Sequence, residues 1–215
     1  MASPETEKFN QLFDYLSAPE RPAIPEAHGV LVFGRHDLRL VEGMRDLDSL
    51  GLASFFVISG GLGKDSGRLH DWNIPEAKFL AAVATAQPHP IPAERIYTDI
   101  LAKNGGQNAR FGLATMRTSG LRNSPITALA HATSLRRLAA TLEHEGSKLE
   151  EPVEKVYRYG TNYRFDATNP EDQHEAAAEF MRLVEWPHKG WLQPQGDLPV
   201  DLIEFAAETV ATLEP

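Results

Sequence analysis

The chain has 215 residues, of which 42% are hydrophobic and 24% charged, a composition that supports one globular domain with at most a small appendage. Its formal net charge of −9 is opposite in sign to the surface that nucleic-acid-binding proteins present, so we expect no nucleic-acid partner. The absence of cysteine excludes disulfides, a thiolate nucleophile and cysteine-bound metals, and it favours a cytoplasmic location.

The sequence has no apolar run long enough to cross a bilayer. Its first 16 residues, MASPETEKFNQLFDYL, lack the basic start and hydrophobic stretch of a secretory signal. We therefore expect no membrane partner, and the sequence indicates no particular oligomeric state.

Two kinds of apolar pattern alternate along the chain. Phe9, Leu12, Phe13 and Leu16 recur at helical spacing, whereas GVLVF at 29–33 is a continuous apolar run that is typical of a buried parallel strand. In chain order, these patterns predict helix 4–17, strand 29–33, helix 39–50, strand 53–58, a helix beginning at Pro75, strand 96–97, helix 106–118, strand 126–130, helix 133–145, strand 153–159 and helices 170–185 and 200–213.

The alternation of strands and helices predicts an α/β fold built from βαβ units, because the connections between strands are too long for hairpins. Such a sheet is mainly parallel and is covered by helices on both faces. The pattern changes after Glu151. We therefore expect an N-terminal helix and linker over 1–26, a ligand-binding core over 27–150 and a C-terminal appendage over 151–215.

Ligands bind at the carboxyl ends of the strands in open parallel sheets, so the residues that follow each predicted strand are candidates for a site. These residues are mostly basic or polar, although the chain as a whole is acidic. The candidates are Gly34, Arg35 and His36 after the first strand, Ser59, Gly60, Gly61 and Lys64 after the second, Asp99 after the third, and His131 after the fourth, with Arg136 and Arg137 behind it.

The stretch ISGGLGK at 58–64 has two interpretations. Glycines allow backbone N–H groups to approach an anion closely, and Lys64 adds a positive charge. However, the spacing from Gly60 to Lys64 is too short for a Walker motif, and a dinucleotide fingerprint belongs after the first strand. A phosphate cradle and a tight turn both remain open.

The segment NGGQNAR at 104–110 is a stronger candidate for an anion site. Asn104 is a suitable N-cap for the helix that follows. The free N–H groups of that helix's first turn, at Gly105 and Gly106, are able to bind an anion, and Asn108 lies one turn beyond the cap. The alternative is an ordinary capped surface helix.

Three titratable residues are candidates for acid–base catalysis. His131 has a reference pKa near neutrality, and Asp99 and Glu76 supply carboxyl groups near the same strand ends. His36, Asp37, Asp99 and His131 lack the short ligand spacing of a metal site, so we assign no metal to them. Trp186 and Trp191 are interpreted as packing anchors.

The order and spacing of these segments resemble those of the YdcF-like family, a group of domains of unknown function, and the resemblance is closest to its soluble branch. The likeness covers most of residues 27–200. The matching stretches are VLVFG (30–34), VISGGLG (57–63), PEAKFLAAVA (75–84), IPAERIYTD (91–99), NGGQNARFG (104–112), ATSLRRLAATL (132–142) and GDLP (196–199).

The resemblance implies a Rossmann-like three-layer sandwich with a small C-terminal helical appendage. It also implies an adenosyl-type small-molecule ligand, with S-adenosylmethionine the one usually associated with the family. The ligand residues that it implies are Gly34, Ser59, Gly60, Gly61, Glu76, Asp99, Asn104, Asn108, Arg136 and Arg137.

Three positions depart from the family pattern. Gln107 replaces a usual glutamate, His131 an acidic residue and Ala102 a serine. The loss of an acidic residue and the gain of a histidine make the expected pocket more basic, which weakens the case for a sulfonium ligand and favours a phosphate or a carboxylate. We therefore expect a small-molecule binding protein or an enzyme with its ligand at the carboxyl ends of the strands, and we favour an enzyme of S-adenosylmethionine-dependent transfer or of phosphoryl or nucleotidyl chemistry. The alternative is a non-catalytic module that senses such a ligand or docks a partner protein.

Overall fold

The computed structural model describes residues 3–18, 24–25, 28–63, 66–121, 124–196 and 198–213. Within these ranges, five parallel strands form one sheet in the order β3-β2-β1-β4-β5. The strands are β1 (His28–Phe33), β2 (Ala53–Ser59), β3 (Ile96–Asp99), β4 (Ile126–Ala130) and β5 (Val156–Gly160).

The described α-helices are α1 (Pro4–Ser17), α2 (Arg39–Ser49), α3 (Arg68–Asp71), α4 (Glu76–Ala84), α5 (Gly105–Thr118), α6 (Leu135–Gly146), α7 (Pro170–Glu185) and α8 (Val200–Leu213). Three-residue and four-residue 3₁₀ helices, η2 (Ala93–Arg95), η3 (Ala132–Ser134) and η4 (Trp186–Lys189), join some of these elements. None of the described helices is long and apolar enough to cross a membrane.

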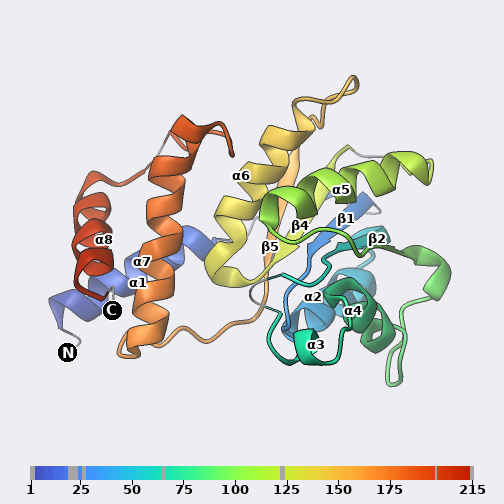
Figure 1. Ribbon diagram of the computed structural model, residues 1–215, viewed down its shortest axis with the longest axis horizontal. Coiled ribbons are helices and arrows are strands. Elements are labelled where there is room, and N and C mark those ends of the chain that lie inside the picture. The colour runs from blue at the N-terminus through green and yellow to red at the C-terminus, as the bar shows by residue number, and fades with distance from the viewer. Residues whose placement is uncertain are drawn as a thin grey trace.

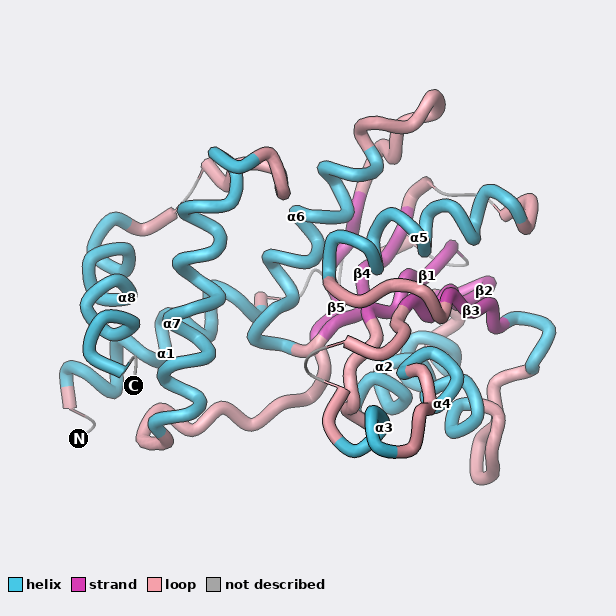
Figure 2. Tube along the Cα trace, viewed as in Figure 1, coloured by secondary structure: helices cyan, strands magenta, loops and turns pink. Residues whose placement is uncertain are grey.

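Helices cover both faces of the sheet, which gives the three layers seen in Figures 1 and 2. On one face, α2 and α4 bury apolar stripes that include Met44 and Leu80. On the other face, α5 and α6 bury stripes that include Leu113 and Leu138. The Rossmann-like α/β fold is therefore confirmed, and the burial of each such side chain stabilises it by roughly 1.5–3 kcal/mol.

A third apolar cluster joins α1, α7 and α8 into a helical unit beside α6 (Figure 1). Phe9 of α1 packs edge-on against Phe205 of α8, and Phe180 of α7 lies in the same cluster. This unit differs from the expected boundaries in two ways. The N-terminal helix belongs to the appendage, and β5, which lies after residue 150, belongs to the sheet because it pairs with β4.

Close packing of α5 on β1 depends on Gly112. A Cβ atom at this position would overlap Cδ1 of the fully buried Leu31. We expect Gly112→Ala to lower the free energy of unfolding by about 1–3 kcal/mol, as overpacked core substitutions do. Urea denaturation measures this change.

The matched control is Gly106→Ala in the same helix. Its Cβ would meet only Asn104 Oδ1, at an ordinary contact distance of 3.5 Å. Stability should stay the same or rise slightly, because alanine is the better helix former. Equal destabilisation by both substitutions would contradict the packing argument.

Candidate functional site

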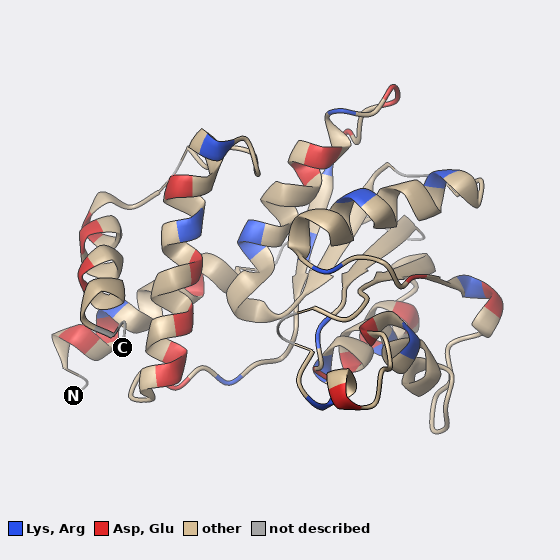
Figure 3. Cartoon of the chain, viewed as in Figure 1, with Lys and Arg blue, Asp and Glu red and all other residues tan. Residues whose placement is uncertain are grey.

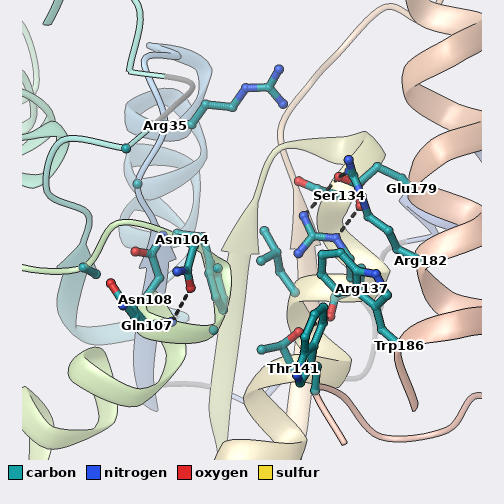
Figure 4. Close-up of a pocket in the computed structure, with 18 of the residues that line it drawn as sticks. Arg35, Asn104, Gln107, Asn108, Ser134, Arg137, Thr141, Glu179, Arg182 and Trp186 are labelled. Carbon is teal, nitrogen blue, oxygen red and sulfur yellow. Dashed lines mark hydrogen bonds and ion pairs between the residues drawn. The ribbon is translucent and has the colours of Figure 1, made fainter. Parts of the chain in front are cut away.

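A cleft of about 860 Å³ opens where the strand order reverses, at the carboxyl ends of β1 and β4. Such switch points are the usual ligand sites of open α/β sheets, and the volume is typical of small-molecule pockets. Gly34 and Arg35 reach the cleft from the loop after β1, and His131 reaches it from the end of β4. In Figure 4, residues of α5 line one wall, and residues of α6, α7 and η4 line the opposite wall.

The first turn of α5 faces this cleft. Asn104 has extended backbone angles, and its Oδ1 accepts the N–H of Gln107 at 3.0 Å, so the predicted N-cap is confirmed. Gly105 and Gly106 line the cleft, and within the described chain their N–H groups have no protein acceptor. These two donors, at the positive end of a 14-residue helix, are available to an anion.

A salt-bridge cluster forms the opposite wall. Glu179 of α7 is buried and accepts two hydrogen bonds from the Arg137 guanidinium, through Nε and Nη2, and one from Arg182 Nη1 at 2.6 Å. Arg137 and Arg182 also lie over the ring of Trp186 (Figure 4). One carboxylate thus holds two guanidinium groups, which leaves one excess positive charge at this wall.

The cleft as a whole carries more basic than acidic side chains. Six basic and four acidic residues line it: Arg35, Lys103, Arg110, Arg137, Lys148 and Arg182 against Glu76, Glu145, Glu175 and Glu179. The three helices of the helical unit, α1, α7 and α8, together carry eleven acidic and two basic side chains, and Figure 3 shows the acidic ones on α7 and α8. The local excess of positive charge favours an anionic ligand.

His131 belongs to a polar chain that links the core to α7. The Thr133 hydroxyl donates to Glu175 Oε1 at 2.9 Å, so His131 Nδ1, at 2.8 Å from that hydroxyl, is the donor to it. Glu175 Oε1 also accepts from Arg35 Nη1 at 2.9 Å. Burial raises the pKa of Glu175, but the hydrogen bond and charge of Arg35 outweigh this effect and lower it.

The second ring nitrogen of His131 faces a carboxylate. Nε2 lies 3.7 Å from Asp37 Oδ2, a buried atom without a hydrogen-bond partner, while Asp37 Oδ1 accepts from the backbone and side chain of Arg39. Burial, together with the positive charges of Arg35 and Arg39, lowers the pKa of His131 to about 4. His131 is therefore neutral at neutral pH, and both of its nitrogens face groups of the protein.

The SGGLG stretch packs against neighbouring loops in the structure. The N–H groups of Gly60, Gly61 and Gly63 donate to Asp99 O, Ala102 O and Ser66 Oγ, so they are already used within the protein. A Cβ at Gly60 or Gly61 would strike neighbouring backbone. Of these glycines only Gly63 lines the cleft. Lys64 lies outside the described residues.

Several other predicted site residues lie away from the cleft. Ser59 donates to Asp99 Oδ2 at 2.7 Å, and the Asp99 carboxylate also accepts the N–H groups of Leu101 and Ala102. This arrangement fixes the loop after β3. His36 is exposed and its ring packs against Phe79 of α4.

Arg136 and Arg137 point to different sides of α6. Arg136 lies over the ring of Tyr15 in α1, with 3.7 Å from its Cζ to the ring centroid, and its Nε donates to Gln195. It holds α1 and the segment before α8 against the core, whereas Arg137 lines the cleft. Successive helix residues are about 100° apart, so only one of the two arginines faces the ligand side.

Glu76 lies at the cleft, at the start of α4. It is buried, and its Oε1 accepts the Ser66 hydroxyl at 2.8 Å. Its Oε2 lies beside the backbone of Gly34 and Gly60, where a Cβ at either glycine would meet it. Glu76 and His131 are thus the two predicted acid–base residues that the structure places at the cleft.

The C-terminal part of the chain contributes a wall of the cleft that was not predicted from the sequence. His174, Glu175, Glu179 and Arg182 of α7 line the cleft together with Trp186 and Trp191, of which Trp191 is 53% exposed. Arg110, Glu145 and Lys148 form a second ion-pair cluster there. The spacing of Glu175, Glu179 and Arg182 along one helical face was the available signal.

Within the described chain, no three His, Asp or Glu side chains converge in a way that would hold a metal ion. No protein-family model matches the sequence, and no curated protein matches it. The chemistry of this cleft therefore has to be derived from its own residues.

Proposed function

We propose that the protein binds a phosphorylated, nucleotide-like small molecule in the cleft at the carboxyl ends of β1 and β4. The observation that carries this proposal is the excess of basic side chains and free helix N–H groups in the cleft of a protein whose net charge is −9. An anion gains from both kinds of group, and a cleft of about 860 Å³ has room for a nucleotide.

S-Adenosylmethionine is the second candidate ligand, and it rests on the resemblance to the YdcF-like family. Its sulfonium needs carboxylates or aromatic faces, which Glu76 and Trp191 would supply. We rank it second because most carboxylates of the cleft already pair with arginine or lysine.

Catalysis on the bound molecule stays a prediction. Of the expected acid–base groups, Glu76 and His131 line the cleft, and transferase or phosphoryl chemistry would have to use them. A ligand-sensing module without turnover needs neither residue. A cytoplasmic location, where nucleotides are abundant, is part of the same proposal.

A thermal-shift screen tests the proposal. The purified protein is heated with S-adenosylmethionine, S-adenosylhomocysteine, ATP, ADP, NAD and sugar nucleotides. A ligand at about 100 times its Kd should stabilise the fold by about 2.7 kcal/mol, which shifts the melting temperature by several degrees. We expect phosphorylated nucleotides to raise it. If only S-adenosylmethionine and S-adenosylhomocysteine raise the melting temperature, the ligand is of the adenosylmethionine type and not a phosphorylated nucleotide. If no compound raises it, the proposal is refuted.

A further inference from the structure

Arg137 brings a guanidinium group to the start of α5. A Cβ built at Gly105 would lie 3.2 Å from Arg137 Nη1, so this nitrogen lies against the first turn of the helix. Nε and Nη2 of Arg137 donate to Glu179, and Nη1 has no acceptor within the described residues. A guanidinium donor and the positive end of a helix dipole are thus adjacent, an arrangement that an anion between them would stabilise.

Asn108 adds a side chain that has no hydrogen-bond partner among the described residues. It is 6% exposed, it lines the cleft, and its Oδ1 is buried without a hydrogen bond. Buried polar atoms are normally paired, and an anion, which accepts hydrogen bonds, pairs with the carboxamide nitrogen of this side chain and not with Oδ1. Because Oδ1 is the enclosed atom, the Nδ2 group is the donor that is left to face the cleft. Figure 4 shows Asn108 beside Asn104 and Gln107, at the same end of α5.

We propose that the N-terminus of α5 is a phosphoryl subsite, at which Gly105 N–H, Gly106 N–H, Asn108 and Arg137 Nη1 bind the phosphate group of the ligand. This inference rests on the proposed function and adds the position and the chemistry of the anionic end. Four donor groups come from two helices, α5 and α6. A tetrahedral phosphate offers oxygens to all of them, whereas a planar carboxylate has only two oxygens.

An NMR titration with inorganic phosphate tests the subsite at its own atoms. ¹⁵N-labelled protein is titrated with phosphate, with acetate, and with potassium chloride at equal ionic strength. We expect the Gly105 and Gly106 amide protons to move downfield and saturate with phosphate. Acetate should bind at least tenfold more weakly, and chloride should produce no saturable shift. Equal binding of acetate, or phosphate shifts confined to other amides, would overturn the assignment.

Asn108→Leu is the matching variant, because leucine keeps the approximate shape and removes both polar atoms. We expect at least a tenfold loss of phosphate affinity with an unchanged or higher melting temperature, since the orphaned oxygen is also removed. Arg117→Gln, an exposed arginine at the other end of α5, is the control and should bind phosphate as the parent does.

Any nucleotide that stabilises the parent protein in the thermal-shift screen also distinguishes the phosphoryl subsite from the proposed function. If such a nucleotide binds Asn108→Leu as tightly as it binds the parent, the subsite is wrong while the proposed function stands. If neither phosphate nor any nucleotide binds the parent, both are wrong. If Asn108→Leu loses both phosphate and the nucleotide, both are supported.

Discussion

Glu179→Gln should destabilise the protein by about 3 kcal/mol. The substitution removes the carboxylate that Arg137 and Arg182 share and leaves the 12%-exposed Arg137 guanidinium without a counter-ion. Breaking a buried ion pair from one side costs about 3–5 kcal/mol, and the 40% exposure of Arg182 reduces that figure here. Urea denaturation at pH 7 measures the loss.

The same substitution should tighten anion binding, because a carboxylate then no longer neutralises the charge of Arg137, whose Nη1 already lies against the start of α5. We expect inorganic phosphate to bind several-fold more tightly than it binds the parent. Glu185→Gln is the control on the same helix, since Glu185 is exposed and pairs only weakly with Lys189 at 3.7 Å. It should change stability by less than about 0.5 kcal/mol. Unchanged stability of Glu179→Gln would show that the shared carboxylate does not hold the wall of the cleft.

The fold was predictable because its signals are local. The continuous apolar run that forms β1 is buried on both sides of the sheet, and the helical spacing of Phe9, Leu12 and Leu16 matches the buried stripe of α1. The strand order and the grouping of α1 with α7 and α8 could not be predicted, because they depend on contacts such as Phe9 with Phe205 that join the two ends of the chain.

The site was predictable where a residue directly follows a strand or begins a helix. Gly34, Arg35 and His131 reach the cleft because parallel strands end at one edge of the sheet, and Asn104 caps α5 as its position indicates. The role of Arg136 was not predictable. Its direction on α6 depends on where α1 packs, and that contact involves residues more than 100 positions away.

The role of the glycines after β2 could not be predicted from the sequence for a different reason. Glycine permits close approach of a backbone to any neighbour, and the sequence does not state whether that neighbour is a phosphate or another loop. Here Gly61 lies against the backbone of Ile100 and Ala102. The same residue type at Gly105 and Gly106 instead leaves two N–H groups facing the cleft, because they begin a helix rather than bridge two loops.

Stability should fall as the pH is lowered through the range from about 6.5 to about 4, and His131 should account for a large part of this fall. Its folded-state pKa is about 4, whereas an unfolded histidine titrates near 6.5. Between these values the unfolded chain binds a proton that the folded protein does not, so acid favours unfolding. The difference amounts to about 2 kcal/mol between pH 7 and pH 5.

His131→Asn isolates this contribution. Urea unfolding at pH 7 and at pH 5 gives the difference in the free energy of unfolding between the two pH values for the parent and for the variant. We expect this difference to be about 2 kcal/mol smaller in the variant. His70→Asn, at an exposed position of α3, should keep the full dependence. Glu175 contributes little to the difference between pH 7 and pH 5. Because its pKa is lowered in the folded protein, the stability that its carboxylate contributes is lost only below its ordinary pKa near 4.5. If His131→Asn kept the parent's dependence, the imidazole would titrate in the folded protein near 6.5, as it does in the unfolded chain, and the hydrogen-bond chain from His131 through Thr133 to Glu175 would have to be reassigned.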